Sequence, residues 1–308
     1  MSARLLIIDC DPGQDDAVAL LLAFASPELD VRAVTAVAGN VPLDLTAANA
    51  RRICELAGRA DVPVHAGCAR PLLAPLETAA HVHGESGLAG ADLPEAAAPL
   101  APGHAVDVMI ERVLAAPGAV TIAALGPLTN LALAIVKEPR FAPAIGEIVL
   151  MGGAIEGGNV TRHAEFNLYV DPHAAAIVFG AGAPLTMIGL DVTRRAVATA
   201  ERVAAIRAIG TPAAEAVAGM LSLHLERAAG ATGESGGLVH DACVTAYLLR
   251  PELFTVRPMA ITVETADPEK RGKTVVDAAG APTNADVVLG IDADGFFALL
   301  TERLAALR

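Results

Sequence analysis

Aromatic residues and cysteines are scarce in this chain. Its 308 residues include no Trp, two Tyr, seven Phe and four Cys. With so few aromatic rings, any recognition of a nucleobase must rely mainly on aliphatic and polar contacts rather than on stacking. The cysteines have no CxxC or CxxxH spacing, which argues against a zinc motif and a disulfide framework. They are Cys10, Cys54, Cys68 and Cys243.

Clustered positive charge and long apolar runs are also missing. The formal net charge is -13 and no run of Lys or Arg occurs, which argues against a nucleic-acid polymer as partner. The apolar run that follows Met1–Arg4 is too short for a signal peptide, and no uncharged apolar segment of about 18 residues occurs elsewhere. We therefore expect a cytoplasmic protein without a membrane partner.

Apolar residues make up 54% of the chain, enough for a large core. Short aliphatic or β-branched runs alternate with Ala- and Leu-rich amphipathic segments, which is typical of a parallel sheet covered by helices. No linker composition interrupts the pattern, so we predict one α/β domain over residues 1–308 with a single open, mostly parallel but mixed sheet. Expected strands are residues 5–9, 31–38, 62–65, 120–125, 148–151 and 185–190, with β-like runs at 259–263, 274–277 and 287–291; expected helices are 15–25, 43–57, 105–115, 128–136, 172–179, 200–209, 241–249 and the C-terminal segment.

Three segments rich in Gly or Pro predict loops, namely residues 68–103, 152–171 and 228–237. The last of these reads AAGATGESGG.

Four aspartates, Asp9, Asp11, Asp15 and Asp16, fall where an expected strand ends and a helix begins, which is where open α/β sheets bind ligands. Acids in a first helical turn have an ordinary explanation, because the helix N-terminus favours them by roughly 0.3–1 kcal/mol each. Converging carboxylates would nevertheless repel by about 4 kcal/mol per pair at about 4 Å and an effective dielectric near 20. A bound hard cation, Ca²⁺ or Mg²⁺, resolves this repulsion.

The aspartate cluster has two other possible interpretations. A calcium-binding EF-hand loop starting at Asp9 would need Gly where Gln14 stands and Glu where Leu20 stands, so that reading fails. A metal-dependent phosphohydrolase also uses two aspartates one residue apart at a strand end, with Asp9 or Asp11 as nucleophile. The tight turn at Pro12-Gly13 followed by two more acids departs from that pattern, but the alternative stays open.

The segment Asp9-Cys10-Asp11-Pro12-Gly13-Gln14-Asp15-Asp16 resembles the DxDPGxDD signature of the nucleoside hydrolases, also called inosine-uridine preferring nucleoside hydrolases. Further matches follow in the family's order, from residue 5 to about 249. The resemblance implies a Rossmann-like fold, calcium-dependent hydrolysis of the N-glycosidic bond of ribonucleosides, and a homodimer or homotetramer. The matching segments are AGNV around Asn40, HGESGL at 83–88, LGPLTN at 125–130, MGG at 151–153, AEFN at 164–167 with Asp171-Pro172, and VHD at 239–241.

The resemblance implies a calcium site made by Asp11, Asp16, Asp241 and the backbone carbonyl of Leu125. It also implies that Asp11 is the general base that activates the attacking water. Asp241 has an ordinary alternative as a helix N-cap. Asp9 is left as a support that orients its neighbours.

The resemblance further assigns a set of residues to the substrate. Polar loop residues usually face water, but carboxylates and amides also suit ribose hydroxyls, because a site built around hydroxyls rejects analogues that lack them. Asn40 is expected to orient the water or to accompany the metal. The ribose contacts would be Asp15, Asn159, Glu165 and Asn167, with Met151 packing under the sugar.

Histidines are the candidates for contact with the base. His81 lies in an expected lid, and His240 matches the position that protonates the departing purine in several family members. His224 is a further candidate proton donor, whereas His65 reads as structural. Because Trp is absent and small residues replace the tyrosines that some members carry before His240, we expect a pyrimidine-preferring or broad specificity. A catalytically silent calcium-binding relative is the other alternative.

Overall fold

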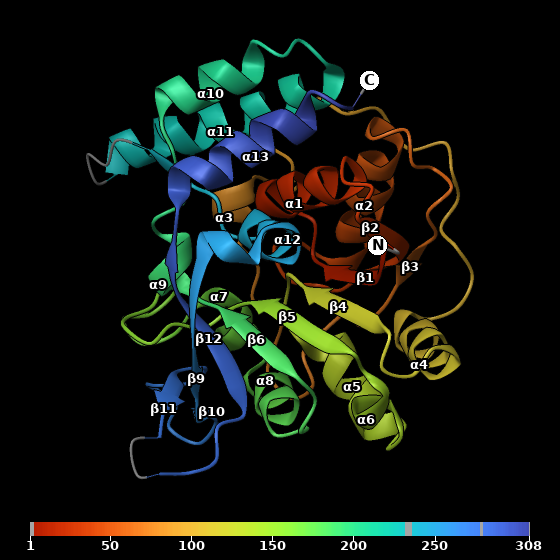
Figure 1. Cartoon of the computed structure of the whole chain (residues 1–308), viewed down its shortest axis with the longest axis vertical. Coiled ribbons are helices and arrows are strands. Elements are labelled where there is room, and N and C mark those ends of the chain that lie inside the picture. The colour runs from red at the N-terminus through yellow and green to blue at the C-terminus, as the bar shows by residue number, and fades with distance from the viewer. Residues whose placement is uncertain (1–2, 232–235, 278–279, 308) are drawn as a thin grey trace.

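The computed structural model describes residues 3–231, 236–277 and 280–307. An eight-stranded sheet runs through its centre in the order β3-β2-β1-β4-β5-β6-β12-β9 (Figure 1). All neighbouring strands are parallel except β9, which pairs antiparallel with β12, so the predicted open, mixed sheet is confirmed. The strands are β1 (Arg4–Cys10), β2 (Leu29–Ala36), β3 (Val64–Ala66), β4 (Val120–Ala124), β5 (Glu147–Met151), β6 (Leu185–Ile188), β9 (Phe254–Met259) and β12 (Ala285–Ile291).

The central strands are apolar along nearly their whole length because helices cover both faces of the sheet. β4 is buried at every residue, and β5 at all but its first. On β1, Ile7 and Ile8 point to opposite faces and join separate core clusters. The edge strand β9 contains Pro258, which an edge position tolerates.

Two helical layers sandwich the sheet (Figure 1). One packs around α1 and α11–α13, and the other contains α4, α5, α6 and α8. Each layer buries an aliphatic cluster against its face of the sheet, which accounts for the high apolar content. The bounds are α1 (Gln14–Phe24), α2 (Leu43–Leu56), α4 (Ala105–Ala115), α5 (Thr129–Lys137), α6 (Phe141–Ala144), α8 (Pro172–Phe179), α10 (Ala200–Arg207), α11 (Pro212–Ala231), α12 (Ala242–Leu249) and α13 (Ala293–Leu304).

Short elements occupy parts of the expected loops. α3 (Ala80–His83) lies within 68–103, and α7 (Phe166–Val170) lies within 152–171, so those two segments are not loops throughout. The expected loop 228–237 is wrong at its start, because α11 continues to Ala231; residues 232–235 lie outside the described residues. The remaining elements are α9 (Leu190–Thr193), η1 (Pro251–Leu253), and the antiparallel pairs β7 (Val197–Ala198) with β8 (Gly237–Leu238) and β10 (Ile261–Val263) with β11 (Thr274–Val276).

The sequence patterns do not predict α11 or most of β9. α11 buries small residues on several sides, so it lacks a clear amphipathic stripe. The expected run 259–263 is instead split, because β9 ends at Met259 and β10 begins at Ile261. Across the described part of the chain, no helix combines the length and apolarity needed to cross a membrane.

Candidate active site

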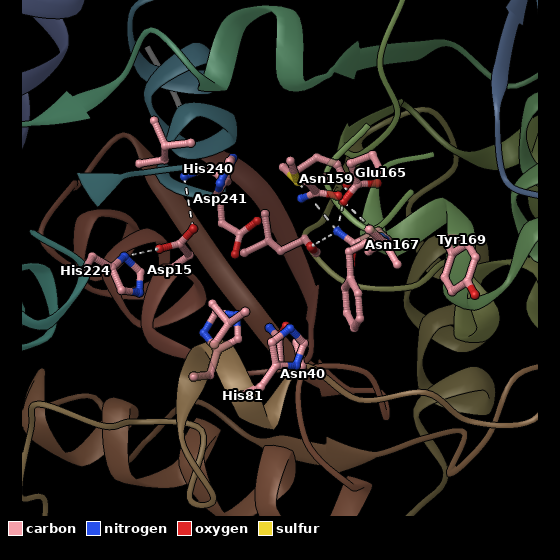
Figure 2. A pocket seen from close by; sticks show the side chains of 18 of the residues that line it. Asp15, Asn40, His81, Asn159, Glu165, Asn167, Tyr169, His224, His240 and Asp241 are labelled. Carbon is pink, nitrogen blue, oxygen red and sulfur yellow. Dashed lines mark hydrogen bonds and ion pairs between the residues drawn. The ribbon is translucent and has the colours of Figure 1, made fainter. Parts of the chain in front are cut away.

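A cavity of about 670 Å³ opens at the carboxyl ends of the central strands (Figure 2). Its walls come from the first turn of α1, the segment after β2, the ends of β4 and β5, α3, α7, α11, β8 and the residues just before α12. Parallel strands bring these segments to one edge of the sheet. Ten predicted site residues line the cavity: Asp15, Asn40, His81, Leu125, Met151, Asn159, Glu165, Asn167, His240 and Asp241.

Asp11 lies fully buried in the turn between β1 and α1. Its Oδ2 accepts a 2.6 Å hydrogen bond from the backbone N–H of Asn40. Gly39 and Gly126 flank the carboxylate so closely that a Cβ on either would overlap it. These two glycines therefore leave the space in which the Asp11 carboxylate is held.

Asp16 and Asp241 differ in how their carboxylates are used. Asp16 lies in the first turn of α1, where its Oδ2 accepts hydrogen bonds from Gly13 N–H at 3.0 Å and from Asn40 Nδ2 at 3.2 Å. The Asp16 carboxylate therefore does cap the N-terminus of α1. Asp241 stands at the N-cap position of α12 but makes no capping hydrogen bond. The Asp241 carboxylate is thus available to the cavity.

The three carboxylates of Asp11, Asp16 and Asp241 share a buried, electronegative environment. Burial raises the pKa of Asp16 to about 6, against the pull of a backbone hydrogen bond from Gly13. Burial and then the Asp16 charge raise the pKa of both Asp11 and Asp241 well above the usual range. Without a counter-charge, this cluster favours partial protonation.

Among the described residues, no three His, Cys, Asp or Glu side chains form a preformed metal site. The donor set nevertheless suits a hard cation, because it consists of carboxylates together with the Leu125 carbonyl. That carbonyl accepts a 2.7 Å hydrogen bond from Asn167 Nδ2, which also donates to the Met151 carbonyl at 3.1 Å. A carbonyl oxygen has a second lone pair, so the Leu125 oxygen keeps the capacity for another partner.

Two groups of polar side chains face the cavity from opposite sides (Figure 2). One group contains Asp15, His224 and His240. Asp15 Oδ2 accepts from the backbone N–H of His240 at 3.2 Å, and the His240 ring Nδ1 lies 2.8 Å from Thr193 Oγ1. Burial lowers the pKa of His240, while the nearby Asp15 charge acts in the opposite direction.

The other group contains Asn159, Glu165 and Asn167 (Figure 2). Glu165 is the N-cap of α7, and its carboxylate accepts 2.9 Å hydrogen bonds from the backbone N–H groups of Asn167 and Gly153. Burial raises the pKa of Glu165 to about 7, although these hydrogen bonds oppose the shift. Glu165 therefore fixes the start of α7, which carries Asn167, against Gly153 just after β5.

Asp9 lies behind the cavity and does not line it. Its Oδ1 accepts from Thr35 Oγ1 at 2.7 Å and from Asn130 Nδ2 at 2.8 Å, and burial raises its pKa to about 6. Asn130 also accepts from the backbone N–H of Cys68 at 2.8 Å. Asp9 on β1 therefore connects to Thr35 on β2 and Asn130 on α5. Neither partner was among the site residues predicted from the sequence.

Sequence reasoning missed several lining residues, including Glu77 and Tyr169. Arg271 lies 3.9 Å above the Tyr169 ring and 2.6 Å from Glu77, while the Tyr169 hydroxyl donates to Glu77 at 3.3 Å. Glu77 and Arg271 are almost 200 residues apart in the sequence, so no local motif could reveal this cluster. His83, which also lines the cavity, lies inside the recognised HGESGL segment and was the easiest to find.

Comparison with known proteins agrees with this geometry. The sequence profile described as inosine-uridine preferring nucleoside hydrolase matches residues 6–298. The chain belongs to this family. It is 47% identical to a pyrimidine-specific ribonucleoside hydrolase of Citrobacter koseri over 304 residues, covering 97% of both chains. It is also 43% identical to an uncharacterised protein of Schizosaccharomyces pombe, covering 98% of this chain and 99% of the relative.

Solved nucleoside hydrolases share the whole fold. A purine-preferring ribonucleoside hydrolase from Gardnerella vaginalis superposes with a TM-score of 0.93 at 32% identity, covering 99% of each chain. A plant nucleoside hydrolase superposes at 0.92 with 33% identity, covering 98% of this chain and 99% of the other. Family membership confirms the expected activity, hydrolysis of ribonucleosides, and disfavours the phosphohydrolase alternative.

Proposed function

We propose that this nucleoside hydrolase cleaves the ribose–base bond with Asp11 as general base. The main support is the Asp11 carboxylate itself, which is buried, oriented by the backbone N–H of Asn40 and enclosed by Gly39 and Gly126. Asp11 does not itself line the cavity, but its partner Asn40 does. Burial beside Asp16 raises the Asp11 pKa, which makes this carboxylate a stronger base than an exposed one. Asn40, which donates to Asp11, would orient the attacking water.

Asp11, Asp16, Asp241 and the Leu125 carbonyl would hold Ca²⁺. Their oxygen-only chemistry, the mutual repulsion of the carboxylates and the uncapped Asp241 side chain support this assignment. When bound, the cation would lower the pKa of a bound water and neutralise the cluster. Asp11 would then remove the proton from the attacking water, and Asp9 would steady β1 from behind.

The ribose would lie between the two polar groups of the cavity. Asp15 would accept hydrogen bonds from ribose hydroxyls on one side, while Asn159, Glu165 and Asn167 would contact the sugar from the other. Met151 also lines the cavity and would pack under the ring. Cleavage places positive charge on the ribosyl group, and this acidic surround would stabilise it.

The base would lie towards His81 and His240. His81 is exposed on α3 at the cavity wall, and His240 would protonate or hydrogen-bond the departing base. A pyrimidine-preferring or broad specificity is our proposal. The relative from C. koseri, named pyrimidine-specific, supports it at 47% identity, compared with 32% for the purine-preferring enzyme.

One assay tests these assignments together. The protein is incubated with uridine, cytidine, inosine or adenosine, with and without a chelator, and free ribose is measured. We expect ribose release that calcium restores after chelation and that is fastest with a pyrimidine. Release of no ribose from any nucleoside would favour a silent relative, while undiminished release with chelator would refute the calcium site.

We also propose a single domain, a cytoplasmic location and a homodimer or homotetramer. The continuous eight-stranded sheet supports the first of these. Light scattering coupled to size-exclusion chromatography measures the oligomer directly, and a monomer would contradict the proposal.

A further inference from the structure

Gln14 joins three parts of the cavity wall through short hydrogen bonds. Its side chain is buried at the start of α1. The amide Nε2 donates to the Ala89 carbonyl at 2.5 Å, and Oε1 lies 2.6 Å from His224 Nε2 on α11. The Gln14 backbone N–H donates to His83 Nδ1 at 3.3 Å.

These contacts fix where the proton lies on His224. The Ala89 carbonyl can only accept, so the amide NH₂ of Gln14 must face it; the flipped amide would place two oxygens in contact. The Gln14 oxygen therefore faces His224 and must accept from Nε2–H. The other ring nitrogen, Nδ1, is thereby directed to Asp15.

One carboxylate oxygen of Asp15 faces this ring. Its Oδ2 accepts from His240 N–H, but within the described part of the chain its buried Oδ1 has no hydrogen-bond partner. His224 Nδ1 lies 3.8 Å from that oxygen. A proton on Nδ1 would face the Asp15 carboxylate at ion-pair distance, whereas a lone pair on Nδ1 would be repelled by it.

Other ionisable groups around His224 come from separate elements. The His83 ring on α3 meets it edge-on at 6.3 Å between centroids, and the nearby His240 ring precedes α12. Asp15 on α1 is the anion paired with the His224 ring.

We propose that Gln14 and His224 are positioning residues that hold the Asp15 carboxylate in place for the ribose hydroxyls. Hydrogen bonds run from the Ala89 carbonyl, in the segment after α3, through Gln14 to His224, and the His224 ring then lies at ion-pair distance, 3.8 Å, from Asp15. The segment after α3 is thereby connected to the carboxylate that would bind the sugar. The proposal rests on the proposed ribose-binding role of Asp15. It adds two residues that are not expected to touch the ribose themselves.

The test compares uridine with 2′-deoxyuridine and 3′-deoxyuridine in Gln14→Met and His224→Phe variants. The Asp15→Asn variant first identifies the hydroxyl that Asp15 binds. It is the hydroxyl whose removal from uridine lowers kcat/KM least in that variant. We expect both positioning variants to lower kcat/KM for uridine by about 10- to 100-fold. The loss should be several-fold smaller for the analogue without the identified hydroxyl.

Double variants separate positioning from a general loss of structure. In an Asp15→Asn background, Gln14→Met and His224→Phe should each change kcat/KM by less than about 2-fold, because their effect acts through Asp15. Ser222→Ala is the matched control on α11, since Ser222 bonds Arg207 and the Ala218 carbonyl instead. It should keep wild-type kinetics.

Two results would overturn this proposal: additive losses of kcat/KM in the double variants, or unchanged kinetics in both single variants. As long as the wild-type protein releases ribose, neither result affects the proposed function. If wild-type protein releases no ribose, the proposed function fails instead. Thermal melting identifies any variant that does not fold. The two single variants alter different elements, so either one that folds suffices for the cycle.

Discussion

Raising the pH of calcium-free protein from about 5 to about 7.5 should lower its thermal stability, and calcium should reverse the loss. The reason is the buried cluster of Asp11, Asp16 and Asp241, whose pKa values are all raised by burial and by neighbouring charge. A carboxyl with a raised pKa in the folded state binds more protons folded than unfolded. Its contribution to stability is therefore complete below the unfolded pKa and is lost as pH rises through the folded pKa.

Asp16 sets the scale of this effect. Its pKa rises from 3.8 to about 6 on folding. One pKa unit corresponds to about 1.4 kcal/mol, so the whole shift of Asp16 is worth about 3 kcal/mol. Because pH 5 is already above the unfolded pKa, about 1.4 kcal/mol of this is lost between about pH 5 and about pH 7.5. A loss of that size lowers the Tm by roughly 2–5 °C in a protein of this length. Glu165, with a pKa of about 7, adds a loss of the same sign at the upper end of the range.

Differential scanning fluorimetry with chelator or calcium at both pH values measures the effect. Calcium should raise the Tm more at the higher pH, because it favours the ionised carboxylates. Asp241→Asn is the control, since it removes one charge from the cluster. In this variant the chelated protein should lose less stability with rising pH, and the gain from calcium should largely disappear.

Two results would refute the reasoning. A chelated wild-type Tm that stays constant or rises over this pH range would show that the carboxylates are not the destabilising groups. A calcium gain of equal size in Asp241→Asn would place the cation elsewhere. Isothermal titration calorimetry in two buffers gives an independent check, because calcium binding near pH 6 should release protons.

Three further substitutions have defined outcomes. Asp11→Ala should lower kcat by at least about 100-fold without loss of the fold, as removal of a general base does, and near-wild-type turnover would remove the assignment. Gly39→Ala should also lower kcat/KM by about 100-fold, because its Cβ would displace the Asp11 carboxylate; unchanged kinetics would mean that this placement is unimportant. Asn167→Ala leaves the Leu125 and Met151 carbonyls without this donor, so urea denaturation should show a loss of about 2 kcal/mol, and an unchanged midpoint would contradict it.

Local patterns predicted much of the fold and named ten residues that the structure brings to one cavity. β1 and α1 are contiguous apolar segments, and the turn between them contains the aspartates, so strand, helix and site follow from one short stretch. The ends of β4 and β5 were likewise predictable, since their apolar runs stop at Leu125 and Met151. The roles of the gathered residues remain predictions until the variants are measured.

Long-range partners could not be predicted in the same way. Gln14 is adjacent to the signature aspartates, yet its partners Ala89 and His224 come from other elements, and only the packing of α11 over α1 brings them together. α11 itself has no clear amphipathic stripe, because its buried residues are mostly small and lie on several sides. Contacts of this kind depend on tertiary packing rather than on local sequence pattern.

Acidic residues at the start of a helix can either cap the helix or bind a cation, and the structure separates these two explanations for Asp16 and Asp241. Asp16 satisfies the N-terminal backbone of α1 through Gly13, so part of its burial is offset by ordinary capping whether or not a cation binds. Asp241 is the N-cap residue of α12 but its side chain makes no capping hydrogen bond, and its buried charge lies next to that of Asp16. A buried carboxylate that contributes nothing to its own helix is costly, which makes Asp241, more than the four clustered aspartates, the residue that argues for a bound cation.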